Sequence, residues 1–276
     1  MLQAPQSLDL KVGGSWVTWR AFASGAPAAG DPLLASAIRW GEERPGLRIG
    51  TFDVRPTGGI VANSVAIVEV DPARFRFALA AAPRFAVRSA DAWMADSAIV
   101  LAVNTGLFRS DGTPEGLVVL DGVRTGGAAT WLDALVVVED GRLALRESGD
   151  AAALGSGASA FQVLPWLVRR GAVAFGATSG RRLSTTHRDR RLTLCVGSDG
   201  LIRFLLSNFE VFGASAGTIP LGLTIPEQAT IAGAAGCADA VALDGGISAQ
   251  LAVRAGRLHR MPGWREVPLF LVARRR

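Results

Sequence analysis

Asp244 is the acidic residue of this sequence whose neighbours best suit chemistry. The apolar run 240–243 predicts a short buried strand that ends at Asp244. Gly245 and Gly246 follow without side chains, so a ligand can approach the backbone closely, and the two amides can form an anion-binding nest. Asp-Gly-Gly between two apolar strands is also typical of an ordinary hairpin turn. Both interpretations are open at this point.

Asn104 occupies a similar position after a second apolar run. The continuous run 98–103 predicts a fully covered strand, and Gly106 follows shortly after Asn104. An amide side chain at such a strand end can bind a sugar hydroxyl or a phosphate. Because Asn before a turn is common without any function, the pattern alone makes Asn104 a candidate and no more.

A helix is predicted directly before the strand that ends at the Asp-Gly-Gly turn. Thr224 and Glu227 have the spacing of a capping box, and Pro226 suits the first turn of a helix. The run 226–235 is rich in Ala, Gln and Ile, which suits a short packed helix. Gly236 can then end that helix in the left-handed conformation.

Strands and hairpins dominate the rest of the sequence. Alternating apolar and polar residues over 47–79 predict strands with one solvated face. Two hairpins are predicted over 131–145 and 191–206, with turns at 139–141 and 198–200. Glycine is abundant and no long helical pattern occurs. We therefore expect an α+β fold with strand-rich mixed β-sheets and a few short helices.

The composition is that of a globular protein. Hydrophobic residues make up 49% and charged residues 19% of the 276 residues, and no apolar run reaches the length of a membrane span. The formal net charge of +5 comes almost wholly from arginine, since Lys11 is the single lysine. No basic helix or aromatic-basic pattern accompanies this charge, so we expect no nucleic-acid binding. A modest positive balance does favour anionic substrates.

The cysteines and histidines give no pattern of a metal site. Cys195 and Cys237 are far apart in apolar contexts, and we interpret them as two buried thiols, with a disulfide left open. His187 and His259 have no partners at metal-ligand spacing, so we expect neither a metal nor another cofactor. Residues 1–10 lack the regions of a signal peptide, which predicts a cytoplasmic protein or one whose leader has been removed.

Three blocks, in this order, resemble the phosphodiester glycosidase family. Residues 104–108 with 116–119 are similar to the family pattern N-G-G-F-F … G-L-V-V. Residues 161–171 followed by 191–200 are similar to Q-S-G-P-x-L-V-x-x-G … R-T-A-I-G-x-D-x-D-G. Residues 222–250 are similar to G-L-T-L-x-E-L-A … L-D-G-G-G-S. Each motif is short, but the ordered set is fairly specific.

The resemblance covers about residues 48–273 and implies a single domain over 1–276, with 1–47 as an N-terminal strand and loop extension. It also implies hydrolysis of a sugar-1-phosphodiester, typically N-acetylglucosamine linked through phosphate, in an extracytoplasmic setting. The sequence departs from the family motifs at three positions, where it carries bulkier or apolar residues: Thr105, Leu192 and Ile247. We expect these departures to bear on substrate choice and on activity.

Three side chains are the candidates for catalysis, and we expect them to line one pocket. The planar guanidinium of Arg191 suits phosphate oxygens, although one Arg within an Arg-rich run is also an ordinary surface residue. Asn104 is expected to contact a hydroxyl or phosphoryl group, and Asp244 to act as a general base or to orient water. Substrate contacts are expected from five further residues: Gly106, Gly245, Gly246, Ser248 and Thr224.

The second carboxylate that glycoside hydrolysis normally uses is not identifiable. Asp111 and Glu115 lie in the loop after Asn104, where exposed acids are usually only solvated. The leading hypothesis is a hydrolase of a carbohydrate phosphodiester. The alternative is a catalytically silent domain that binds a carbohydrate or a phosphate, and a nuclease-like phosphodiesterase is a weaker third because no cluster of metal ligands supports it. Convergence of Asn104, Arg191 and Asp244 on one open cleft would favour the hydrolase.

Overall fold

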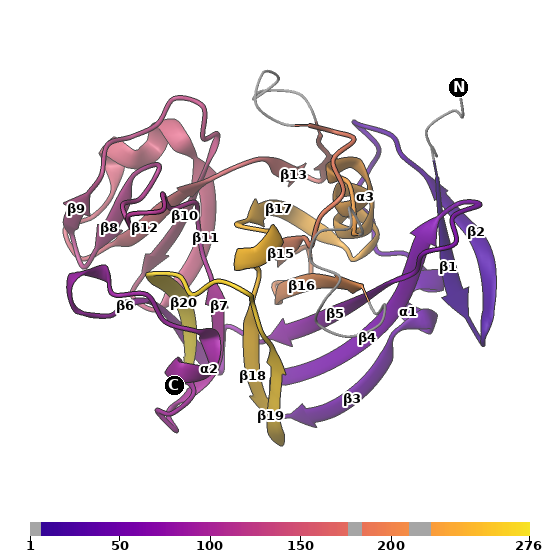
Figure 1. The fold of residues 1–276 in the computed structure, drawn as a ribbon, viewed down its shortest axis with the longest axis horizontal. Coiled ribbons are helices and arrows are strands. Elements are labelled where there is room, and N and C mark those ends of the chain that lie inside the picture. Colours follow the sequence, from indigo (N-terminus) through magenta and orange to yellow (C-terminus); the bar gives the residue numbers. More distant parts are fainter. Residues whose placement is uncertain (1–6, 176–183, 210–221) are drawn as a thin grey trace.

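The computed structural model describes residues 7–175, 184–209 and 222–276. Residues 1–6, the first part of the N-terminal stretch discussed above, lie outside this description. The described residues form three β-sheets with short helices packed against them (Figure 1). Neighbouring strands pair antiparallel in each sheet. The strand-rich α+β class expected from the sequence is confirmed.

The longest sheet in the described residues has ten strands drawn from both halves of the chain. They are β1 (Ser7–Val12), β2 (Ser15–Ala21), β3 (Arg39–Arg44), β4 (Leu47–Pro56), β5 (Asn63–Val70), β13 (Trp166–Arg169), β14 (Ala172–Val173), β15 (Leu192–Gly197), β16 (Ile202–Phe209) and β17 (Cys237–Leu243). Their order is β14-β13-β17-β15-β16-β5-β4-β1-β2, and β3 pairs with β4 outside this path. The strand β17, which leads into the Asp-Gly-Gly turn, is therefore an inner strand between β13 and β15.

Two five-stranded sheets complete the described fold. One contains β8 (Val118–Leu120), β9 (Val123–Thr125), β10 (Ala134–Glu139), β11 (Arg142–Glu147) and β12 (Ser159–Val163), in the order β11-β10-β12-β8-β9. The other contains β6 (Phe75–Ala81), β7 (Ile99–Asn104), β18 (Leu251–Ala255), β19 (Arg257–Met261) and β20 (Leu269–Arg275), in the order β19-β18-β7-β20-β6. Figure 1 shows these two sheets on the left and in the lower centre, with the ten-stranded sheet curving away to the right.

The largest hydrophobic core combines side chains from all three sheets. Phe204 of the long sheet, Phe161 of the β8–β12 sheet and Leu271 of the β6–β20 sheet belong to it, and each is almost fully buried. Phe77 and Phe204 have ring centroids 6.5 Å apart within this core. Because aromatic side chains bury large apolar areas, this shared core fixes how the strand ends of different sheets lie relative to each other.

The helices cover the outer faces of the sheets. The longest is α3 (Ile225–Ala234), which packs with α1 (Pro32–Ala37) against the second face of the ten-stranded sheet. The short α2 (Ala90–Trp93) packs on β7 and β18. No helix in the described ranges is long and apolar enough to cross a membrane.

The capping box predicted before α3 is confirmed. The Thr224 hydroxyl accepts from the Glu227 amide at 3.4 Å, and the Glu227 carboxylate accepts from the Thr224 amide at 2.8 Å. Arg188 donates from two nitrogens to the same carboxylate, at 2.6 and 2.9 Å. Pro226 lies in the first turn, and Gly236 has φ of 76° just after the helix, as expected. The start of α3 is therefore tied to the segment around Arg188.

The two predicted hairpins are also confirmed. The strands β10 and β11 turn at residues 139–141, and β15 and β16 turn at residues 198–200. Local turn chemistry was sufficient to locate both, because Asp and Gly favour the required backbone conformations.

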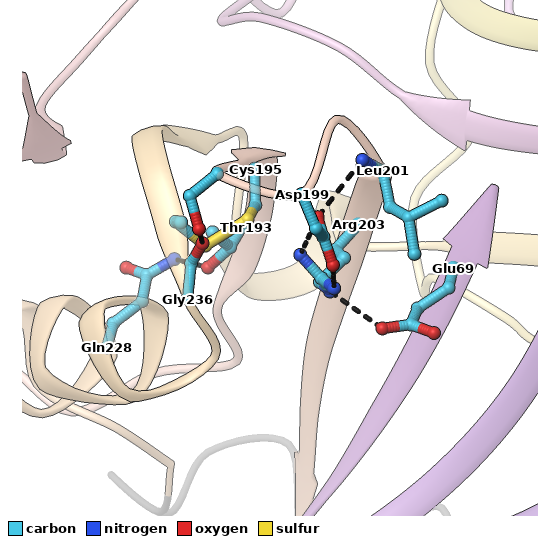
Figure 2. The surroundings of a disulfide bond; sticks show 10 residues. Glu69, Thr193, Cys195, Asp199, Leu201, Arg203, Gln228 and Gly236 are labelled. Carbon is cyan, nitrogen blue, oxygen red and sulfur yellow. Dashed lines mark hydrogen bonds and ion pairs between the residues drawn. A yellow bond between two sulfur atoms is a disulfide. The ribbon is translucent and has the colours of Figure 1, made fainter. Parts of the chain in front are cut away.

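The interpretation of Cys195 and Cys237 as two buried thiols is wrong. They form a disulfide that joins β15 to the start of β17. Figure 2 labels Cys195 and draws the bond between the two sulfur atoms in yellow. The two cysteines are 42 residues apart in sequence, and the antiparallel pairing of β15 with β17 brings them together. Since strand pairing between distant segments is a tertiary property, the cysteine spacing alone did not indicate the bond.

Candidate functional site

A pocket of about 230 Å³ lies where β17 ends. It is bordered by the segment after β7, the segment between β12 and β13, the start of α3 and the turn after β17. Its lining residues fall into a polar and an apolar set. The polar set is Asp189, Arg191, Gln228 and Asp244, with the glycines Gly106, Gly245 and Gly246 beside it. The apolar set includes Leu107, Val163, Pro165, Ile225 and Leu243.

Asp244 is fixed in this pocket by its backbone. Its amide donates to the carbonyl of Thr105 at 2.8 Å, and its carbonyl accepts from Nδ2 of Asn104 at 2.7 Å. Both partners follow or end β7, which belongs to a different sheet from β17. The two strand ends are therefore joined directly, and Asp244 lines the pocket at this junction.

The Asp244 carboxyl has an unusually high pKa. Burial is the largest cause and raises its pKa from 3.8 to about 7. The Ser248 hydroxyl and Arg265 act in the opposite direction, whereas the negative charges of Glu115 and Asp189 raise the pKa further. A carboxyl with a pKa near neutrality can accept or donate a proton at physiological pH, which is what general acid–base catalysis requires.

Asn104 lies behind the pocket and does not line it. Its side chain is 1% exposed, and Oδ1 accepts from the Gln250 amide at 2.8 Å while Nδ2 is held by the Asp244 carbonyl. Both ends of the amide are thus bound to the backbone of the β17–β18 connection. The geometry gives Asn104 the place of a positioning residue for Asp244, where the sequence suggested a substrate contact.

Gly245 and Gly246 allow a neighbouring segment to approach the turn. A Cβ at Gly245 would lie 2.7 Å from the carbonyl of Arg190, and a Cβ at Gly246 would lie 2.8 Å from the Asp189 carboxylate. Gly246 also has φ of 58°, which favours glycine. Its amide donates to the Arg190 carbonyl at 2.9 Å, so that amide is already occupied. The expected anion nest therefore has at most the Gly245 amide to offer.

Arg191 borders the pocket from the start of β15. Its Nε donates to the Leu223 carbonyl at 2.8 Å and its Nη2 donates to the His187 carbonyl at 2.7 Å. Burial lowers the pKa of Arg191, and the charges of Asp189 and Glu227 counteract that effect. An arginine stays protonated under such shifts, so the pocket contains a fixed positive charge. The hydrogen bonds within the described residues do not involve Nη1.

Asp189 is a second acidic residue of the pocket, and no sequence motif marked it as a candidate. It lines the pocket beside Gly246, accepts from the Arg190 amide at 2.9 Å and lies 3.6 Å from His187 Nε2. Its position as the single acid within the run 187–191 was a usable signal, because that run directly precedes β15. Glu115 contributes charge near Asp244, whereas Asp111 is fully exposed.

The other residues expected to contact the substrate differ in their position relative to the pocket. Gly106 lines the pocket, and a Cβ there would lie 2.8 Å from the Gln162 carbonyl. Ser248 is buried and interacts with the Asp244 carboxyl. Thr224 does not line the pocket, since its hydroxyl caps α3. Their direct contact with a substrate stays a prediction.

The three departures from the family motifs are accommodated in different ways. Thr105 is buried and donates to the Leu269 carbonyl at 3.1 Å. Leu192 is fully buried in the shared core. Ile247 is 49% exposed, directly after the pocket residue Gly246. Of the three, Ile247 is the one that a bound molecule can reach.

Comparison with known proteins identifies a family and several similar folds. The family model for phosphodiester glycosidases matches residues 97–274. The catalytic domain of zebrafish N-acetylglucosamine-1-phosphodiester alpha-N-acetylglucosaminidase, auto-inhibited by its pro-peptide, has a similar fold, with a TM-score of 0.65 and 16% sequence identity. That similarity covers 92% of this chain and 96% of the zebrafish chain.

A hypothetical protein from Synechocystis is also similar, with a TM-score of 0.61 and 16% identity. The similarity covers 87% of this chain but only 64% of the Synechocystis chain. No curated protein sequence matches the chain. At these identities the solved structures show the fold alone, whereas the family model spans most of the sequence and includes Asn104, Arg191 and Asp244. The chain belongs to the phosphodiester glycosidase family.

Proposed function

We propose that this protein hydrolyses a sugar-1-phosphodiester in the pocket at the end of β17. The observation that carries the proposal is the Asp244 carboxyl, whose pKa lies near 7 in a pocket that also contains the fixed charge of Arg191. A proton-accepting group beside a phosphate-binding cation is what such a substrate needs. Membership of the phosphodiester glycosidase family supports the same reaction class.

In the proposed reaction, water attacks C1 of the sugar and the bond between C1 and the phosphate oxygen breaks. The phosphate monoester leaves with the electron pair of that bond, and the Asp244 carboxylate takes the proton of the attacking water. Arg191 stabilises the charge on the phosphate, and Arg265, which acts on Asp244 electrostatically, is the second candidate cation. Asp189 is the candidate for the second carboxylate.

N-acetylglucosamine is the sugar to test first, since the zebrafish protein of similar fold is named for its action on an N-acetylglucosamine-1-phosphodiester. The apolar wall formed by Leu107, Val163 and Pro165 offers contacts to the ring or to an acetamido methyl group.

The test is turnover of a small panel of sugar-1-phosphodiesters by the wild type and by Asp244→Asn. We expect the wild type to release the sugar and the variant to lose activity by about 100-fold or more, since proton transfer contributes about 10²–10⁴-fold. The matched control is Asp140→Asn, an exposed residue in the β10–β11 turn, which should remain active.

The pH profile adds an independent readout. If Asp244 accepts the proton, kcat/KM should rise with pH and level off above about 7, the pKa of this carboxyl. A wild type that binds the sugar phosphodiesters but releases no sugar would favour the silent binding domain. Activity that survives in Asp244→Asn would remove this carboxyl from the mechanism.

A further inference from the structure

Ile247 and Trp264 are two exposed apolar residues whose backbones are joined next to the turn that lines the pocket. They are two of the few large hydrophobic side chains that are exposed in the described ranges, at 49% and 47%. Their backbones are joined, because the Trp264 amide donates to the Ile247 carbonyl at 2.8 Å. Single exposed hydrophobic residues need no explanation, but two that are joined beside a pocket do.

Each of the two residues is next in sequence to a residue of the proposed site. Ile247 directly follows Gly246, which lines the pocket. Trp264 directly precedes Arg265, whose amide also donates to the Ile247 carbonyl and whose charge lowers the pKa of Asp244. A group that extends from a phosphate bound near Asp244 over this turn would therefore pass the backbone that bears these two side chains.

The segment that bears Trp264 is held in place. The guanidinium of Arg190 lies 5.6 Å from the centre of the Trp264 ring, and its Nη1 donates to the Pro262 carbonyl at 3.0 Å. Gln250 donates from Nε2 to the Arg265 carbonyl at 2.9 Å. Because these contacts already fix the segment, it loses little conformational entropy when a ligand covers it, which favours binding.

We propose that Ile247 and Trp264 bind the apolar part of the alcohol esterified to the phosphate, so that the substrates are glycosyl phosphodiesters of alkyl or aryl alcohols. This inference rests on the proposed function and specifies the leaving side of its substrate. The family motif has glycine at the position of Ile247, and isoleucine adds an apolar surface without any hydrogen-bonding group. Such a surface favours a hydrocarbon over the hydroxyl groups of a second sugar.

The experiment compares three esters of N-acetylglucosamine-1-phosphate, which carry methyl, n-hexyl or mannosyl groups. We expect the wild type to give a kcat/KM about 10-fold or more higher for the hexyl than for the methyl ester, because each buried methylene contributes to binding. The ratio of the two values should fall by about threefold or more in Ile247→Ala, in Ile247→Thr and in Trp264→Ala. The control Ile60→Ala removes an isoleucine that is 97% exposed and lies between β4 and β5, a segment that contributes no residue to the pocket or to the turn after β17, so the ratio should not change.

Each other outcome has a definite meaning. An equal kcat/KM for hexyl and methyl esters, a preference for the mannosyl ester, or a ratio unchanged in all three variants would overturn the proposal while leaving the hydrolase intact. Inactivity toward every ester would contradict the proposed function instead. In that case calorimetry with n-hexyl phosphate and methyl phosphate tests whether Ile247 and Trp264 bind an apolar group. Tighter binding of the hexyl compound that is lost in Ile247→Ala supports the proposal, and equal binding of the two compounds overturns it.

Discussion

The side-chain amide of Asn104 donates a hydrogen bond to the backbone carbonyl of Asp244 at 2.7 Å and thereby joins the ends of two strands from different sheets. The same side chain accepts from the Gln250 amide at 2.8 Å. One buried residue thus holds both sides of the turn that carries Asp244. The position of that carboxylate depends on the packing of the two sheets as much as on its own strand.

Replacing Asn104 by Ala should therefore reduce both stability and activity. The change leaves the Asp244 carbonyl and the Gln250 amide without partners in a buried site, which should lower the free energy of unfolding by about 1–3 kcal/mol. Denaturant unfolding measures this effect. A variant of unchanged stability that fails to bind substrate would instead make Asn104 a direct ligand contact.

Removing the disulfide should reduce stability without changing the site. A disulfide between residues 42 apart in sequence lowers the entropy of the unfolded chain, which stabilises the folded state by roughly 4 kcal/mol. The Cys195→Ala, Cys237→Ala double variant should therefore unfold at a lower denaturant concentration. The wild type treated with a reductant provides the matched comparison and should show a similar loss. An unfolding midpoint that neither treatment alters would mean that the bond does not form in solution. Disulfides persist mainly in oxidising compartments, which supports the extracytoplasmic setting implied by the family resemblance.

The raised pKa of Asp244 makes a prediction about stability as a function of pH. A carboxyl whose pKa rises from 3.8 to about 7 on folding favours the folded state below pH 3.8, and this contribution is lost as the pH rises through about 7. Asp244→Asn removes the cost of burying the charge, so at pH 8 the variant should be more stable than the wild type by about 1–3 kcal/mol, a range that allows for partial solvent screening. At pH 4 the two proteins should be nearly equal. Unfolding free energies measured at both pH values test this prediction, and equal stability of the two proteins at pH 8 would show that folding does not raise the pKa of Asp244.

Local patterns in the sequence located the elements that carry the site. The capping box of Thr224 with Glu227, the left-handed Gly236 and the strand ends at Asn104 and Asp244 all depend on neighbours within a few residues. Backbone preference and capping act over the same short range, which is why these features were predictable.

Features that depend on distant partners were not predictable in this way. The Cys195–Cys237 bond requires β15 to pair with β17, and the place of Asp189 beside Gly246 requires the segment before β15 to cross the turn after β17. The double hydrogen bond of Asn104 requires two sheets to meet. Sequence spacing carries no direct signal for any of these contacts.

The structure changes what is expected of Arg191→Lys. From the sequence, this replacement should cost transition-state stabilisation and leave the fold unaffected, because lysine keeps the charge but loses the planar fork. In the structure Nε of Arg191 also donates to the Leu223 carbonyl and Nη2 donates to the His187 carbonyl. Lysine cannot satisfy both acceptors while it reaches a ligand.

We therefore expect Arg191→Lys to lower kcat/KM by an amount equivalent to about 1.5–3 kcal/mol and to lower the unfolding free energy by about 1 kcal/mol as well. Turnover of a sugar phosphodiester and the thermal midpoint, measured on the same variant, separate the two effects. Arg170→Lys is the control, since that arginine is largely exposed and pairs only at 3.8 Å with Glu147. Full activity with a lowered midpoint would make Arg191 a support for the segment 187–191 alone, and Arg265 would then be the principal phosphate-binding cation.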